Sequence, residues 1–386
     1  MSIREWSLLL AILLSSCSGS VDTTIKETNY QTIFSSLLQE CIDHSFMSVP
    51  GVTMTIKSPL LEETWSGAAG FSDMEQKTKA KTTHPFRIAS VTKTFVAAAI
   101  LRLHELDSLS IDDSIVLHIG EPFISILRSD GYQPEKMLVK HCLNHTSGLF
   151  DYAQGSSDYL TEMIKDPKRR WTRLDQLKGA MQWGDKLGEP GEQTTYCDTG
   201  YILLGLIIEK FYDGDLAKGL RQLLKFEALG LKNTWLETLE PHPNAGQFMV
   251  HRYHGKYETT DWDASIDLYG GGGLASTTGD LADFFYAIFN HEIYDNPQTI
   301  DLMLTLPDYK STEDNNITNQ IKYYNYGLWT VNAFGEQVYV HTGFWCTTII
   351  YVPAYQASIA VNATRGTTDR LIKKVLLVLK QLKENK

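Results

Sequence analysis

The chain changes from an extended to a helical pattern within one stretch, Pro85-Phe86-Arg87-Ile88-Ala89-Ser90-Val91-Thr92-Lys93. Apolar residues recur at three-residue spacing after it, and this spacing predicts a helix from Val91 to about Leu106. Ser90 is therefore expected at a helix N-terminus, where unpaired N–H groups and the helix dipole favour negative charge. Lys93 follows three residues later, so its side chain is expected on the same helix face as Ser90.

This spacing of serine and lysine suits nucleophilic catalysis. A serine hydroxyl is a weak nucleophile unless a neighbouring group takes its proton. A lysine kept neutral by burial or by nearby cations can take it. The alternative is that Ser90 only caps the helix and that Lys93 is solvated, and the pair by itself does not exclude that alternative.

Strand patterns lie at both ends of the chain, and helix patterns lie between them. Residues 51–57 and 63–67 predict an early antiparallel pair, and residues 326–332, 337–342, 347–352 and 357–361 predict later strands. Helices are expected at 200–212, within 274–289, and from Thr368 to about Lys383. The fold class is therefore predicted as α/β (α+β), with an antiparallel sheet flanked by helices and an all-helical lobe. The expected sheet lobe covers about 30–88 and 317–386, and the helical lobe covers about 89–316.

Two later segments carry further candidate groups. Tyr196 stands in the segment 189–205, and a phenol beside a cationic lysine can have a lowered pKa and accept a proton. His341, Thr342 and Gly343 lie in a predicted strand. Gly343 would let a substrate backbone lie close to the strand edge, while the other two side chains would bind a substrate carboxylate or shuttle protons.

Taken together, these motifs resemble the serine β-lactamase and penicillin-binding family. The fuller signatures resemble its branch of class C β-lactamases, DD-carboxypeptidases and esterases. The matching segments are 86–93, Leu143-Asn144-His145-Thr146-Ser147-Gly148-Leu149, 190–205, Gly272-Gly273-Leu274-Ala275-Ser276-Thr277 and His341-Thr342-Gly343. The resemblance implies that Ser90 attacks a carbonyl, that Lys93 and Tyr196 handle its proton, and that the backbone N–H groups of Ser90 and Phe344 form the oxyanion hole.

Two positions depart from the family pattern. Asp198 stands where the family usually has asparagine, and a carboxylate can only accept hydrogen bonds where an amide also donates. Asp198 is also expected to hold Lys93 protonated, which would move the base role to Tyr196. His341 replaces the usual lysine, as in certain DD-carboxypeptidases and D-amino-acid peptidases.

The resulting prediction is a serine hydrolase of the DD-carboxypeptidase or D-amino-acid peptidase type. It would act on a small peptide, amide or ester, such as a peptidoglycan stem peptide, as a monomer without metal or organic cofactor. A carboxylesterase, a class C-like β-lactamase and a catalytically silent peptidoglycan- or β-lactam-binding protein remain alternatives. We interpret His145, Asp151 and the tyrosines at 323, 324 and 326 as structural residues.

The N-terminus predicts export. The apolar run 8–14 covers about 10 Å of a ~30 Å hydrocarbon core, so it fits a signal peptide (1–16) better than a membrane span. Cys17 fits a lipobox, followed by a tether (17–29) before the domain at 30–386. We expect lipid anchoring in the cell envelope, at the periplasmic face of the outer membrane. A net charge of −11 argues against nucleic-acid binding.

Overall fold

The computed structural model describes residues 30–43, 49–244, 246–306, 322–333 and 335–386. The signal peptide, the tether and Cys17 lie outside these residues, and the expectations about them stay predictions. In the described part of the chain, no helix combines the length and the apolar character needed to cross a membrane.

An antiparallel sheet of seven strands forms one half of the molecule, in the order β2-β1-β12-β11-β10-β9-β8. Its strands are β1 (Gly51–Lys57), β2 (Trp65–Gly70), β8 (Lys322–Tyr324), β9 (Trp329–Ala333), β10 (Glu336–Gly343), β11 (Thr347–Val352) and β12 (Ala357–Ala363). β1 pairs with β12 in the register Met54↔Val361, so the two ends of the chain build one sheet. This arrangement confirms the predicted fold class.

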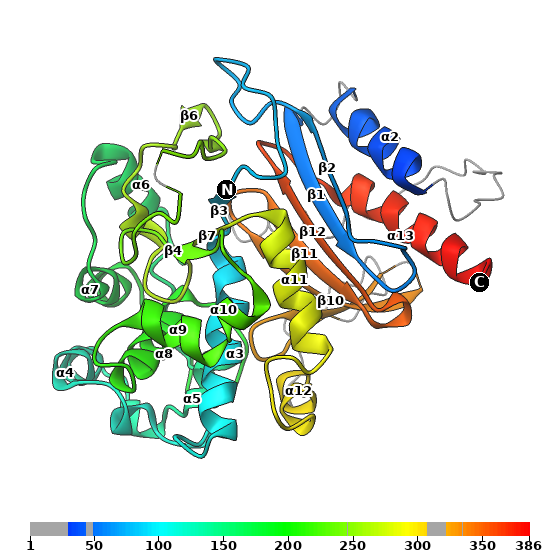
Figure 1. The fold of residues 1–386 in the computed structure, drawn as a ribbon. Coiled ribbons are helices and arrows are strands. Elements are labelled where there is room, and N and C mark those ends of the chain that lie inside the picture. The colour runs from blue at the N-terminus through cyan, green and yellow to red at the C-terminus, as the bar shows by residue number, and fades with distance from the viewer. Residues whose placement is uncertain (1–29, 44–48, 245, 307–321, 334) are drawn as a thin grey trace.

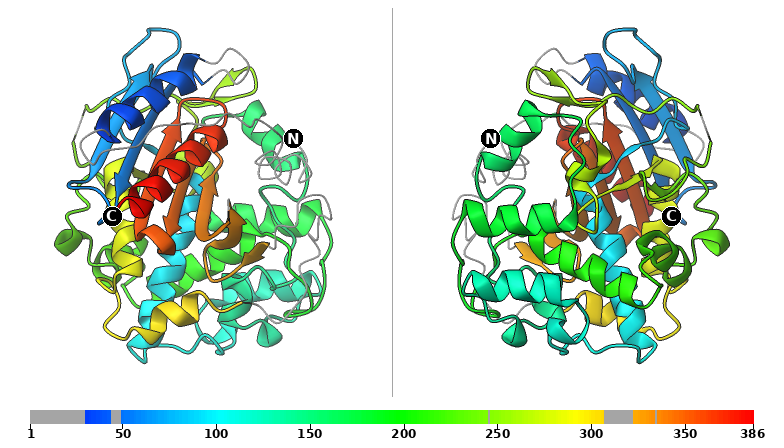
Figure 2. Two further views of the ribbon diagram at one scale, coloured as in Figure 1. Left: turned by 90° about the vertical axis from the view of Figure 1, so that its right-hand side faces the viewer. Right: turned by 90° about the vertical axis from the view of Figure 1, so that its left-hand side faces the viewer.

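Helices cover both faces of the sheet. α2 (Tyr30–Asp43) and α13 (Asp369–Glu384) lie side by side over one face, as Figure 2 shows. Their apolar stripes pack on alternate strand residues such as Met54 and Ile359, whose side chains point to that face. α11 (Thr278–Phe289) covers the opposite face and contacts β12, β1 and β11.

The start of α11 differs from the sequence prediction. The helix expected within 274–289 is a short strand, β7 (Leu274–Ser276), followed by α11. Thr277 caps the helix by accepting a hydrogen bond from the Asp280 N–H, which fixes where the helix begins. α11 also packs on the sheet, although it lies inside the range expected for the helical lobe.

The remaining helices lie on the left and at the bottom of the view in Figure 1, away from α2 and α13. They are α3 (Thr92–Glu105), α4 (Glu121–Ser129), α5 (Val139–Leu143), α6 (Asp158–Lys165), α7 (Arg173–Trp183), α8 (Asp198–Lys210), α9 (Leu216–Leu223), α10 (Phe226–Leu229) and α12 (Gln298–Met303). Short strands β3 (Phe86–Arg87), β4 (Trp235–Leu236) and β7 form a small sheet, and β5 (Tyr253–His254) pairs with β6 (Tyr257–Glu258). The predicted segment around Ser90 joins β3 to α3 and lies against β10 and β11 of the large sheet.

Candidate active site

Ser90 lies in the turn between β3 and α3. The turn is a 3₁₀ segment, Ala89–Val91, and Ala89 has a left-handed φ of 47°, a conformation that costs free energy for a residue with a Cβ. The Ser90 side chain is half-buried, so its hydroxyl is still accessible to a substrate. The structure thus presents this hydroxyl at the start of a helix, as predicted from the sequence.

Lys93 is completely buried, and its ammonium group has three acceptors. Its Nζ donates to Ser90 Oγ at 3.0 Å and to the Gly271 carbonyl at 2.7 Å, and it forms a close ion pair with the Asp198 carboxylate. An ammonium group has three donors, so this set of acceptors satisfies all of them.

The ion pair with Asp198 sets the charge of Lys93. Burial lowers the pKa of Lys93, but the negative charge of Asp198 raises it, and the net pKa lies above its ordinary range. Asp198 is only 4% exposed, and its backbone N–H donates to Asp151 at 2.9 Å. Asp198 thus faces Lys93 more than the open side of the site, and its direct role in substrate binding stays a prediction.

Tyr196 lies next to both groups. The Lys93 Nζ is 5.0 Å from the centre of the Tyr196 ring, and both Lys93 and Ser90 are close enough to the phenol to lower its pKa. Burial raises the pKa of Tyr196, the charge of Lys93 lowers it, and Asp198 raises it again, with a net increase. The expected lowering by Lys93 exists but is outweighed by burial, so Tyr196 is a neutral phenol able to donate a proton.

The end of β10 lies next to the turn that holds Ser90 and borders the site. Pairing with β9 ends at Val340↔Trp329, whereas pairing with β11 continues to Gly343↔Thr347. The last three residues of β10 therefore form a strand edge. At Gly343, a Cβ atom would lie 2.2 Å from the Ile88 carbonyl oxygen, so only glycine allows β10 to approach the backbone that leads to Ser90.

This approach places Phe344, directly after Gly343, near the turn that holds Ser90. Its side chain is exposed and stacks on His254 of β5, with ring centres 5.1 Å apart. The oxyanion role of the Ser90 and Phe344 backbone and the substrate-binding role of the half-buried Thr342 stay predictions.

His341 is 1% exposed, and both of its ring nitrogens have partners. Nε2 lies 3.1 Å from the Tyr324 hydroxyl, and Nδ1 lies 2.9 Å from the Thr342 carbonyl oxygen. Burial and the charge of Lys93 lower the pKa of His341 to about 3, so the ring is neutral. These contacts indicate that His341 orients Tyr324, and its predicted contact with substrate has no geometric support here.

His145 shows why the L-N-H-T-S-G segment belongs to the site. Its Nδ1 accepts the Cys197 N–H at 3.1 Å, and its ring lies 4.3 Å from that of Tyr196. Cys197 stands between Tyr196 and Asp198, so one histidine fixes the backbone of both. Burial and the charge of Lys93 lower the pKa of His145 well below its ordinary value, so it packs as a neutral ring.

Two further carboxylates lie near Lys93, and the sequence reasoning did not assign them to the site. Asp151 is buried, and burial together with Asp198 raises its pKa to about 7. Asp267 is half-buried and packs on Gly272, where an added Cβ would lie 2.1 Å from a carboxylate oxygen. Burial raises the pKa of Asp267 to about 7 although Lys93 lowers it. The glycine run 270–273 was a sequence signal for close packing, but nothing in the sequence indicated which carboxylate packs there.

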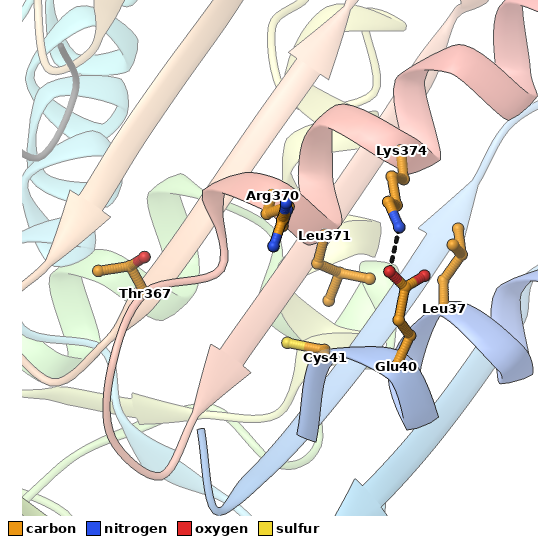
Figure 3. A pocket seen from close by; sticks show the side chains of 7 residues that line it. All are labelled: Leu37, Glu40, Cys41, Thr367, Arg370, Leu371 and Lys374. Carbon is orange, nitrogen blue, oxygen red and sulfur yellow. Dashed lines mark hydrogen bonds and ion pairs between the residues drawn. The ribbon is translucent and has the colours of Figure 1, made fainter. Parts of the chain in front are cut away.

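A small pocket elsewhere in the structure does not overlap this site. It measures about 20 Å³ and lies between α2 and α13 (Figure 3). The pocket is lined by Leu37, Glu40, Cys41, Thr367, Arg370, Leu371 and Lys374. These helices cover the face of the sheet opposite α11, so the pocket is separated from Ser90 by the sheet itself.

Comparison with known proteins gives a consistent family assignment. The family model described as "Beta-lactamase" matches residues 61–382, which include all five segments from 86–93 to 341–343. Protein flp of Staphylococcus aureus (strain NCTC 8325 / PS 47) is 28% identical over 201 residues, 52% of this chain and 34% of that protein. Penicillin-binding protein 4* of Bacillus subtilis (strain 168) is 26% identical over 238 residues, 58% of this chain and 49% of that protein. The chain thus spans about a third to a half of these relatives.

A solved structure shares the whole fold. The D-amino acid amidase from Ochrobactrum anthropi SV3, in complex with D-phenylalanine, superposes with a TM-score of 0.75. The match covers 92% of this chain and 99% of the amidase, with 22% sequence identity. At this identity the likeness establishes the fold.

Proposed function

This chain belongs to the beta-lactamase family, and from that premise we propose that it is a serine acyl hydrolase that forms an acyl-enzyme on Ser90. The observation that carries the proposal is the contact of Lys93 Nζ with Ser90 Oγ at 3.0 Å, with the Tyr196 ring centre 5.0 Å from the same Nζ. The geometry matches the requirement for a nucleophile with a proton acceptor within hydrogen-bond reach.

The proton path runs through Lys93 in this proposal. As Ser90 Oγ attacks the substrate carbonyl, its proton moves to Lys93 Nζ while Lys93 passes a proton to the adjacent Asp198 carboxylate. Tyr196, a neutral phenol, then donates its proton to the leaving nitrogen or oxygen and recovers a proton from Lys93 and Asp198. Asp198 keeps Lys93 protonated in the resting enzyme, which by itself would prevent Lys93 from acting as a base. Because Asp198 accepts a proton from Lys93 during attack, Lys93 can still take the Ser90 proton.

We further propose that the preferred acyl group carries a free amine. Asp267 is a half-buried carboxylate whose charge acts on Lys93, and in this proposal it accepts from a substrate ammonium because Asp198 is paired with Lys93. A D-amino-acid amide or a short peptide with a free N-terminus meets this requirement. The fold shared with a D-amino acid amidase supports this substrate class.

The direct test is covalent labelling. We expect a fluorophosphonate to add one adduct mass to the intact protein, and peptide mapping to place the adduct on Ser90. Labelling of another residue, or of none, would refute the assigned nucleophile and leave the binding-protein alternative.

Replacing Asp198 by asparagine should shift specificity toward β-lactams. The amide restores a charge-neutral donor worth roughly 0.5–1.5 kcal/mol, or about two- to twelvefold in the ratio of the two kcat/KM values, while loss of the proton acceptor lowers both values. Lys93 also loses the carboxylate that raises its pKa. The measurement is kcat/KM for a chromogenic cephalosporin relative to a D-alanyl anilide, with Asp213→Asn, an exposed carboxylate, as the control. A wild type that hydrolyses the cephalosporin efficiently, with a slower Asp198→Asn variant, would contradict this role.

The role of Asp267 predicts a pH dependence of substrate binding. Because its pKa is raised to about 7, Asp267 is largely neutral at pH 5.5 and gains its charge as pH rises through 7. The KM for a D-alanyl anilide should therefore fall about fourfold between pH 5.5 and 7.5, for a pair worth ~1 kcal/mol when Asp267 is fully ionised.

A variant and a second substrate separate the ionisation of Asp267 from the titration of other groups in the site. Asp267→Asn should lose the fall in KM but keep kcat for the N-acetylated anilide, which has no ammonium group. An equal fall in KM for both substrates would show that another group causes it.

A further inference from the structure

Two buried arginines lie side by side behind the turn that carries Ser90. Arg87 ends β3 and is 6% exposed, and Arg252 precedes β5 and is 5% exposed. Their backbones run together, since the Val250 N–H donates to the Pro85 carbonyl at 2.9 Å. Both guanidinium groups also bind the same short segment, Arg87 at the Trp262 carbonyl (3.1 Å) and Arg252 at the Thr260 carbonyl.

The positive charges of this pair are only partly compensated. The two carboxylate oxygens of Glu237 accept hydrogen bonds from Arg87, one from Nε and the other from the terminal nitrogen Nη2. Glu258 and Asp261 are also near Arg252, but both are exposed. The half-buried Glu237 therefore contacts Arg87 alone, and no carboxylate forms a hydrogen bond or ion pair with Arg252 in the described part of the chain. An uncompensated buried charge is strongly destabilising.

Three nitrogen atoms of these side chains have no hydrogen-bond partner among the described residues. They are Arg87 Nη1, Arg252 Nε and Arg252 Nη1, and each is shielded from solvent. Burial and the neighbouring Arg87 lower the pKa of Arg252 to about 9, which is the expected effect of a second cation without its own counter-ion. Unpartnered buried donors of this kind require an occupant.

We propose that a small monovalent anion of the halide class, chloride under ordinary conditions, binds between Arg87 and Arg252. A single anion accepts several N–H hydrogen bonds at once and adds a negative charge at a position where the nearby carboxylates of Glu258 and Asp261 are exposed. A water molecule could accept the same hydrogen bonds but would leave the charge unbalanced. A halide also needs less space than a polyatomic oxyanion at this buried position.

The anion would connect the base of the β5–β6 hairpin to the strand before the nucleophile. The same hairpin carries His254, which stacks on Phe344 at the end of β10. Loss of the anion should therefore loosen a segment that contacts the site, without removing a catalytic group. This inference does not depend on the substrate of the enzyme.

The test is thermal unfolding in sodium chloride and in sodium gluconate at equal ionic strength. Chloride should raise Tm along a saturating curve, by about 3 °C at tenfold the chloride Kd, whereas gluconate should not. Arg252→Gln should abolish the difference between the two salts, and Arg370→Gln, an exposed arginine of α13, should keep it. Identical Tm values of the wild type in both salts would overturn the proposal.

A crystallographic measurement decides the question if Arg252→Gln does not fold. Wild-type crystals soaked in sodium bromide should show an anomalous peak between the Arg87 and Arg252 guanidinium groups. A water molecule at this position, with no anomalous peak, would exclude a halide.

Discussion

Ser90→Ala is expected to lose turnover by roughly three orders of magnitude or more and to lose all covalent labelling by fluorophosphonates. Removal of a nucleophile leaves only binding and polarisation of the substrate, and such variants retain a very small part of the activity. The Ser90 hydroxyl accepts one hydrogen bond from Lys93 and is half-buried, so its removal should change Tm little. Intact mass after labelling and kcat/KM for a D-alanyl anilide measure the two losses.

A matched serine variant guards against an indirect effect. Ser129→Ala removes an exposed hydroxyl at the end of α4 and should keep both labelling and turnover. Full activity of Ser90→Ala would end the hypothesis, because turnover would then have to use a nucleophile other than Ser90. Loss of activity together with a large loss of Tm would instead indicate a structural role for Ser90.

Lys93→Met is expected to reduce both turnover and stability. Methionine has a similar length but cannot take the Ser90 proton, and loss of a positioned base costs about 10²- to 10⁴-fold in rate. The substitution also leaves the Asp198 carboxylate, 4% exposed, without its cation. Breaking a buried ion pair from one side costs about 3–5 kcal/mol in the free energy of unfolding. Denaturant unfolding and kcat measure the two effects.

The double variant Lys93→Met/Asp198→Asn separates catalysis from stability. Removing both charges avoids an unpaired buried carboxylate, so most of the lost free energy of unfolding should return. Turnover should stay low, since the base is still missing. A double variant as unstable as Lys93→Met would show that the ion pair does not stabilise this part of the core. Normal turnover of Lys93→Met would exclude Lys93 from the proton path.

Local sequence patterns predicted many of the elements that build the site. The 3.6-residue periodicity after Val91 gave α3, and the alternation in residues 51–57 gave β1, because burial of one face imposes these periods directly. The predicted start of α11 was wrong because the cap at Thr277 fixes where this helix begins. The apolar run used for the prediction starts earlier and includes β7. Capping depends on one side-chain contact, and a search for apolar periodicity does not detect it.

The sequence by itself was enough to predict the fold class and to propose Ser90, Lys93 and Tyr196 as site residues, because these depend on local periodicity and on ordered motifs. Only the tertiary structure showed that Asp198 is bonded to Lys93, that both nitrogens of His341 are occupied and that the charge of the half-buried Asp267 acts on Lys93. These facts depend on which segments, far apart in the chain, lie within hydrogen-bond distance. Burial and neighbouring charges then decide the protonation state of each group, and neither can be read from the spacing of residues along the sequence.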